Sequence, residues 1–377
     1  MSTTESDVPV LYDGWSLVHQ SNSSAALYLW GLLVNIPAGF RPVVALPGEA
    51  PDWLPGFPLQ TAFAAVEDTP WGRLKWEQRL LPVLARQVQA RLIHLCTGFA
   101  PLFPGVPVVA SLVDYDIFPS HSPPSFADRL RRSIGAGGLA RAAAALQPDD
   151  LHLLSSSRLK PVTPFSLPQF SEMNDLAAVS PISIPFDPGD SFVLYHGPTD
   201  LRSLHRLFSA WSWAAASSPT LLILVGVSPH LTEVIANVMQ QYDVADTVLV
   251  LPSQPPAVIA GLYRDCTALF HPAEVTAWGE PVRSALICGK PIVAAYSPQV
   301  DALVGPAAYL APMDDSRALG AALLSVLVDE NLAEQLAQAA RLRSAAWRTK
   351  SSADILLPIY HAALSMGAKA SRQNASR

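Results

Sequence analysis

The chain has 377 residues, half of them hydrophobic and 15% charged, with a formal net charge of -6. This length suits two domains with large buried cores, and the composition excludes an intrinsically disordered chain. The acidic balance argues against a nucleic-acid partner, because phosphate binding requires clustered Lys and Arg.

The first part of the chain alternates short apolar runs with amphipathic segments. Strands are expected at 8–14, 41–48, 91–96, 106–114 and 151–157, and helices at 24–35, 75–90 and 126–146. Elements that alternate at this spacing are typical of a parallel sheet with helices on both faces. Residues 1–160 are therefore predicted to form one Rossmann-like domain.

A segment rich in Pro and Ser, residues 161–190, follows and is expected to be a linker. The alternation then restarts, with strands expected at 191–197, 220–226, 244–251, 267–272, 291–296 and 307–312, and helices at 201–218, 229–242, 255–266, 281–289, 315–329 and 330–346. Residues 191–350 are predicted to be a second Rossmann-like domain, and 351–377 a C-terminal helix with a polar tail. Open α/β sheets bind ligands outside the carboxyl ends of their strands, so we expect a site in a cleft between the domains.

The run "GEPVRSALICGKPIVAAYSPQV" (279–300) resembles the "GLPVLEAMACGVPVVAS" run of the retaining, family-four-like glycosyltransferases. The run "VLYHGPTDLRSLHRL" (193–207) is similar to the strand and "VGRLDPRKN" loop that open the same half of those enzymes. The resemblance implies the GT-B fold, in which two Rossmann-like, open parallel-sheet domains face each other across a cleft. In that fold residues 1–160 are the acceptor side, and residues 191–350 take a nucleotide-diphosphate sugar as donor substrate without a metal or other cofactor.

The resemblance also assigns the site residues. The donor-binding set is Gly197, Arg202, Trp278, Gly279, Glu280, Pro281 and Ser284, and the catalytic candidates are Asp114 and Thr276. In the family, glutamates contact the donor at the positions of Thr276 and Ser284. The arginine and lysine that neutralise the leaving diphosphate fall on Pro198 and Ser203, so charges that normally stabilise the transition state are missing.

Two hypotheses for the function remain open. The first is an active glycosyltransferase of glycan or cell-envelope polysaccharide synthesis, which transfers a hexose from a nucleotide-diphosphate sugar to a glycan acceptor. The second is a catalytically inactive pseudo-glycosyltransferase, a scaffold that binds a glycan or an active homologous glycosyltransferase. Binding of a nucleotide would favour the first hypothesis over the second.

The expected location is the cytoplasm. No apolar run reaches the ~18 residues that span a bilayer, and the N-terminus lacks a basic and apolar signal sequence. The segment 126–146 carries Arg129, Arg132 and Arg141, which have two interpretations: peripheral contact with anionic lipid at the inner membrane face, or the wet side of a surface helix. The three cysteines lie far apart, without the spacing of a metal site.

Overall fold

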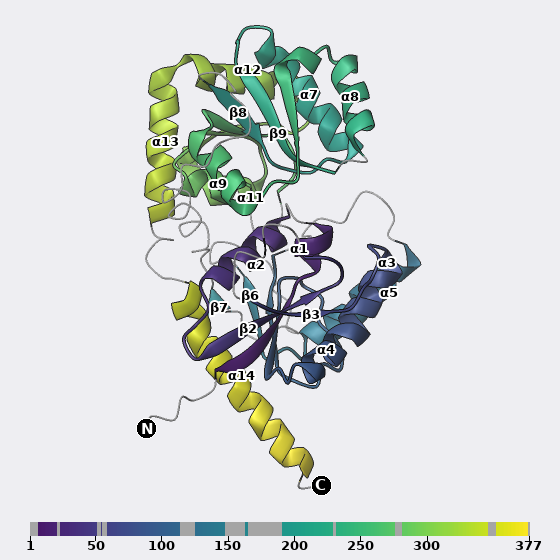
Figure 1. Ribbon diagram of the computed structural model, residues 1–377. Coiled ribbons are helices and arrows are strands. Elements are labelled where there is room, and N and C mark those ends of the chain that lie inside the picture. The colour runs from purple at the N-terminus through teal and green to yellow at the C-terminus, as the bar shows by residue number, and fades with distance from the viewer. Residues whose placement is uncertain are drawn as a thin grey trace. The chain divides into compact units, whose positions relative to one another are not determined.

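The computed structural model describes residues 7–20, 23–50, 54, 59–113, 125–147, 163–164, 191–228, 231–275, 281–345 and 352–375. The chain divides into two compact units. Unit 1 combines residues 1–169 with residues 350–377, and unit 2 contains most of residues 170–349. Each unit is a twisted sheet with helices packed against it (Figure 1).

The sheet of unit 1 has seven strands in the order β3-β2-β1-β4-β5-β6-β7, all paired in parallel. Its strands are β1 (Val8–Asp13), β2 (Phe40–Leu46), β3 (Gln60–Phe63), β4 (Leu92–Leu95), β5 (Val108–Ser111), β6 (Ala144–Gln147) and β7 (Thr163–Pro164). Its helices are α1 (Trp15–His19), α2 (Ser24–Val34), α3 (Pro70–Lys75), the π-helix η2 (Trp76–Leu80), α4 (Leu81–Gln87), α5 (Phe126–Leu139) and α14 (Ser352–Ala375). The central strands β4 and β5 are buried along their whole length, as expected where helices cover both faces of a parallel sheet.

The sheet of unit 2 has six parallel strands in the order β10-β9-β8-β11-β12-β13. Its strands are β8 (Phe192–Tyr195), β9 (Leu221–Val227), β10 (Val248–Pro252), β11 (Ala268–His271), β12 (Ile292–Ala295) and β13 (Ala308–Ala311). Its helices are α7 (Leu201–Ala215), α8 (Thr232–Gln241), the 3-10 helix η4 (Ala245–Thr247), α9 (Pro256–Asp265), α10 (Val282–Ile287), α11 (Pro298–Val304), the 3-10 helix η5 (Gly305–Ala307), α12 (Ser316–Val328) and α13 (Glu330–Ala345). The predicted α/β class, with an open parallel sheet in each half of the chain, is confirmed.

One helix prediction in unit 1 was wrong. The sequence predicts one helix over the whole segment 126–146, whose end is rich in alanine, the best helix former. In the structure α5 ends at Leu139, and Ala144–Gln147 forms β6 beside β5, with Ala144 opposite Val109. Pairing with β5 on one side and with β7 on the other therefore outweighs the local helix propensity of this run. The strand predicted at 151–157 lies outside the described residues.

Helix α14 packs against β4 and β5 of unit 1 and is tied to them by buried hydrogen bonds. The hydroxyl of Tyr360 lies 2.9 Å from that of Tyr12 and 2.6 Å from His94 Nδ1. His94 Nε2 lies 2.9 Å from the hydroxyl of Ser111, which lies 2.7 Å from that of Tyr28. The chain of contacts satisfies both ring nitrogens of a histidine that is completely buried. The C-terminal helix is thus part of the core of unit 1.

We expect acid to destabilise unit 1 through His94. Burial lowers the pKa of His94 to about 3 in the folded chain, from an ordinary value of 6.5. Above about pH 7.5 the ring is almost entirely neutral in both the folded and the unfolded state. As the pH falls from 6.5 to about 3, the unfolded state binds a proton that the folded state does not, so stability is lost. The contribution of His94 is a loss of about 2 kcal/mol between about pH 7.5 and about pH 5.

Hydrogen exchange of the β1 and β4 amides at these two pH values measures the free energy of opening of unit 1. His94→Gln should remove that part of the pH dependence, whereas His361→Gln, at an exposed position of α14, should keep it. An equal loss in wild type and His94→Gln would contradict this origin of acid sensitivity.

Candidate functional site

Two loops of unit 2 leave the sheet at the same edge. Strand β8 ends at Tyr195 and β11 at His271, and the two strands pair in parallel, with Leu269 opposite Leu194. The loop after β8 contains Gly197, and the loop after β11 leads to α10. This is the edge at which open α/β sheets bind their ligands.

The loop after β8 is held against the ring of His271. The hydroxyl of Tyr195 donates a hydrogen bond to the carbonyl oxygen of Pro198 at 2.6 Å. The rings of Tyr195 and His271 are stacked, with centroids 5.9 Å apart. A Cβ atom at Gly197 would lie 2.9 Å from His271 Cε1 and 3.0 Å from the Tyr195 hydroxyl, so only glycine fits without displacement. The resemblance predicts that Gly197 binds the donor; the geometry shows that packing requires a glycine here, and the donor-binding role stays a prediction.

His271 presents a buried acceptor at the same place. Its Nε2 lies 3.2 Å from the carbonyl oxygen of Glu274, and since a carbonyl only accepts, Nε2 carries the proton. Nδ1 is then a lone-pair acceptor, and it has no hydrogen-bond partner within the described part of the chain. Burial lowers the pKa of His271 to about 4, so the ring is neutral at pH 7. A donor group of a ligand, such as a hydroxyl, would satisfy this atom.

At the N-terminus of α7, Asp200 and Ser203 are used for capping. Asp200 Oδ1 accepts hydrogen bonds from the backbone N–H groups of Arg202 and Ser203, both at 3.1 Å, and Oδ2 accepts one from the Ser203 hydroxyl at 2.5 Å. The hydroxyl that stands in the family's lysine position is therefore engaged locally. The side chain of Arg202 is exposed and supplies the positive charge at this helix end.

Short helix α10 carries the other predicted donor residues that the structure describes. Pro281 is its N-cap, and Gly289, with φ of 64°, follows its last turn as predicted. Ser284 and Arg283 are each only 1% exposed. A guanidinium this deeply buried requires hydrogen bonds or a counter-charge. Sequence reasoning did not identify Arg283 as a buried charge beside the candidate site.

Five of the predicted site residues fall outside the part of the chain that the structure describes. They are Asp114, Thr276, Trp278, Gly279 and Glu280. Their roles stay predictions. Across the described ranges, no cluster of His, Cys, Asp and Glu has an arrangement that would hold a metal ion.

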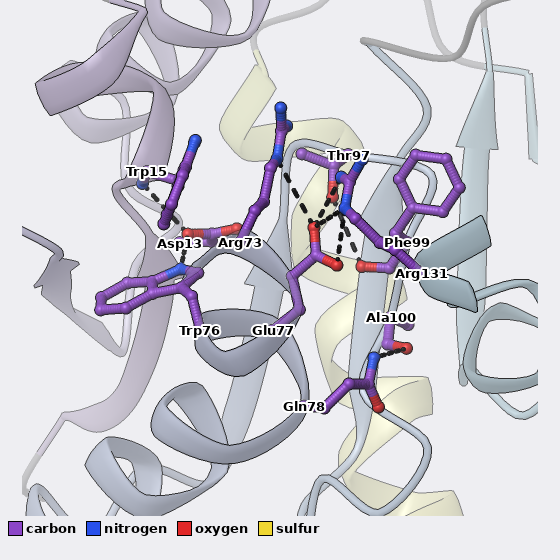
Figure 2. A network of polar contacts seen from close by, with 10 residues as sticks. All are labelled: Asp13, Trp15, Arg73, Trp76, Glu77, Gln78, Thr97, Phe99, Ala100 and Arg131. Carbon is purple, nitrogen blue, oxygen red and sulfur yellow. Dashed lines mark hydrogen bonds and ion pairs between the residues drawn. The ribbon is translucent and has the colours of Figure 1, made fainter. Parts of the chain in front are cut away.

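A second group of polar side chains lies at the carboxyl end of β1 in unit 1 (Figure 2). Asp13 Oδ1 accepts hydrogen bonds from Trp76 Nε1 at 2.8 Å and from the backbone N–H of Trp15 at 3.1 Å. Glu77 accepts three hydrogen bonds from Arg131, at 2.6, 2.9 and 3.0 Å. Burial raises the pKa values of both carboxyl groups, and the neighbouring donors and arginines oppose that rise. This group was not predicted from the sequence.

The second half of the chain matches a known family. Residues 185–343 match the family model described as "Glycosyl transferases group 1". The D-inositol 3-phosphate glycosyltransferase of Segniliparus rotundus is 27% identical over 203 residues, which cover 51% of this chain and 44% of that enzyme. The match therefore spans less than half the length of that relative.

Solved structures share the fold across almost the whole chain. Sucrose-phosphate synthase of Thermosynechococcus elongatus has a TM-score of 0.64 at 17% identity, and HepE of Anabaena, in complex with UDP and glucose, has 0.64 at 16%. Each likeness covers 98% of this chain and 100% of the other. The chain has the GT-B fold, which confirms the fold expected from the sequence.

We expect Gly197→Ala to destabilise unit 2, because the added Cβ requires His271 and Tyr195 to move apart. The free energy of unfolding should fall by about 1–3 kcal/mol, as is usual for overpacking. A matched control is Gly137→Ala in α5, where the Cβ would meet Leu102 at an ordinary 3.4 Å; it should be neutral or stabilise by up to about 1 kcal/mol. Urea unfolding of both variants checks this, and equal effects would show that the loop adapts freely.

Proposed function

We propose that the chain transfers a hexose from a nucleotide-diphosphate sugar, on the premise that residues 185–343 are a domain of the group 1 glycosyltransferases. The observation that carries the proposal is the edge where β8 and β11 end. The loop after β8 packs Gly197 against His271 and leads to the exposed charge of Arg202. At the end of the neighbouring strand β11, His271 Nδ1 is a buried hydrogen-bond acceptor. The binding of UDP and glucose by HepE supports the same class of donor.

The chemistry at this edge depends on few charges. A leaving diphosphate develops negative charge that cations and N–H donors normally stabilise. Arg202 is the exposed cation at the start of α7, while Ser203 is used in the helix cap. Hydrogen bonds between neutral groups are about half as strong as charge-assisted ones. Transfer is therefore expected to be slow. We expect the acceptor to be a glycan and the reaction to belong to glycan or cell-envelope polysaccharide synthesis.

A second candidate function is that of a catalytically inactive scaffold. It is favoured by Ser203 and Ser284, which are neutral where the resemblance implies a lysine and a glutamate; the Ser203 hydroxyl is bonded to Asp200, and Ser284 is buried. Such a protein would hold a glycan or pair with an active homologous glycosyltransferase. It would keep the fold without the transfer step.

Nucleotide binding separates the two candidates. In a thermal-shift screen with UDP, GDP, ADP and their sugars, one nucleotide at a hundred times its dissociation constant should stabilise the protein by about 2.7 kcal/mol. Arg202→Gln should weaken that binding about tenfold or more, because it removes a charge-assisted hydrogen bond. Arg86→Gln, an exposed arginine of unit 1, should leave it unchanged.

The nucleotide that binds then names the donor for a transfer assay. Binding together with hexose transfer supports the enzyme. A folded protein that no nucleotide stabilises contradicts the donor site and favours the scaffold.

We also propose peripheral contact of unit 1 with anionic lipid at the cytoplasmic face of the membrane. Helices α3 and α5 lie side by side (Figure 1) and expose Trp71 and Phe126, which are 57% and 65% exposed with ring centroids 6.4 Å apart. Arg129 and Arg132 are exposed on the same helix as Phe126. Aromatic rings beside arginines suit the headgroup region of an anionic bilayer. None of the helices described has both the length and the apolar character to cross a membrane.

Sedimentation with lipid vesicles tests this contact. Vesicles containing phosphatidylglycerol should bind the protein, and pure phosphatidylcholine should bind it much less. The double variant Arg129→Gln/Arg132→Gln should lose about tenfold or more of the binding, at about 1 kcal/mol per arginine. Arg86→Gln removes an exposed charge from α4 and should leave the binding to vesicles unchanged. Equal binding to both lipids would contradict an electrostatic contact.

A further inference from the structure

We propose that the carboxyl end of β1 in unit 1 binds an oxyanion, a phosphate or carboxylate group of a ligand, through the indole N–H of Trp15 and the guanidinium of Arg73. Asp13, Glu77 and Arg131 are positioning residues that hold these two donors. The inference goes beyond the proposed function, because such a group would bind here whether the protein transfers a sugar or not.

The first observation is a buried donor without an acceptor. Trp15 is 1% exposed, and its Nε1 makes no hydrogen bond among the described residues. The neighbouring Trp76, with its ring 6.0 Å away, donates its own Nε1–H to Asp13. Buried polar atoms nearly always have a partner, so an exception requires an explanation. A ligand oxygen supplies one.

The second observation is a guanidinium with spare donors. Arginine has five N–H groups. Arg73 Nε lies 3.7 Å from Glu77 Oε1, an ion pair beyond hydrogen-bond distance, and Arg73 Cζ lies 5.7 Å from the centroid of the Trp15 ring. Figure 2 shows the guanidinium of Arg73 and the indole nitrogen of Trp15 pointing to the same side, away from Asp13. Two donors with a common direction match an oxyanion with two or more oxygens.

The charges of the group also favour an anion. Glu77 and Arg131 neutralise each other in a pair closed by three hydrogen bonds. Asp13 accepts its hydrogen bonds from Trp76 Nε1 and from the backbone N–H of Trp15 rather than from Arg73, and burial raises the pKa of its carboxyl group. The side chain of Arg73 is 17% exposed, so its positive charge is partly buried and open to solvent at one end. Such a charge is a binding group for a negatively charged ligand.

The backbone that carries Trp76 and Glu77 has an unusual conformation, a turn of π-helix. Trp76 and Glu77 open the π-helix η2, and both are buried and directed at the polar group. Single turns of π-helix are rare and occur often at functional sites. Here the turn delivers two consecutive side chains to Asp13 and Arg131, which fixes the positions from which Trp15 and Arg73 reach the ligand.

The test is a titration of the Trp15 indole resonance in ¹⁵N-labelled protein at constant ionic strength. The chain has nine tryptophans, and the signal missing from Trp15→Phe identifies Trp15. Inorganic phosphate at millimolar concentration should shift this signal downfield in wild type. A parallel titration with glucuronate distinguishes a carboxylate ligand from a phosphate ligand, and a shift with either anion supports the site.

The matched pair of variants is Arg73→Gln and Lys75→Gln, which remove one positive charge each from α3. Arg73→Gln should weaken anion binding about tenfold or more, while Lys75→Gln, exposed on the same helix, should leave it unchanged. Arg73→Lys keeps the positive charge but loses the planar, forked set of guanidinium N–H donors, so this variant should bind the anion with intermediate affinity. The other indole signals report whether each variant is folded. The proposal is overturned if neither anion moves the Trp15 signal in folded wild type, or if both glutamine variants bind equally.

Discussion

Parallel pairing of the strands is the constraint on which both candidate sites depend. In each sheet the carboxyl ends lie at a single edge, so loops from distant parts of the chain leave the sheet together. In unit 2 this places Gly197 beside His271, although the two are far apart in sequence. In unit 1 it places Asp13 at the edge where Trp76 and Arg131 converge (Figure 2). The chemistry of the protein follows from this arrangement of strands.

Buried polar groups differ between the core and the candidate sites. His94 in the core of unit 1 has a hydrogen-bond partner on each ring nitrogen and links a strand to α14. By contrast, Trp15 Nε1 and His271 Nδ1 lack partners among the described residues. Both lie at the carboxyl edge of their sheet. Completed pairing is typical of polar groups that stabilise the fold, whereas the incomplete pairing at this edge is the observation from which we propose the two ligand contacts.

Most of the fold can be predicted from the sequence, but only some residues of the two candidate sites can. Apolar runs such as "TLLILVG" identify the strands, because parallel strands buried on both faces are continuously hydrophobic. The helix predicted over the alanines before Gln147 was wrong, because pairing with β5 and β7 overrides their helix propensity. The resemblance predicts Gly197 as a donor-binding residue, and the structure shows only why packing requires a glycine there. The contact between Glu77 and Arg131 could not be predicted, because both residues look like the polar face of a surface helix until the fold brings them together.

The position of α14 has a consequence for the order of synthesis. Unit 1 begins with β1 but takes its last core helix from residues 352–375, after the whole of unit 2 has left the ribosome. Unit 2 has all its strands by Ala311 and can fold first. Until Tyr360 emerges, His94 Nδ1 and the hydroxyl of Tyr12 lack the buried partner that α14 supplies. Unit 1 can therefore complete its core only after the residues of unit 2 have been synthesised, although its strands β1 to β7 precede unit 2 in the chain.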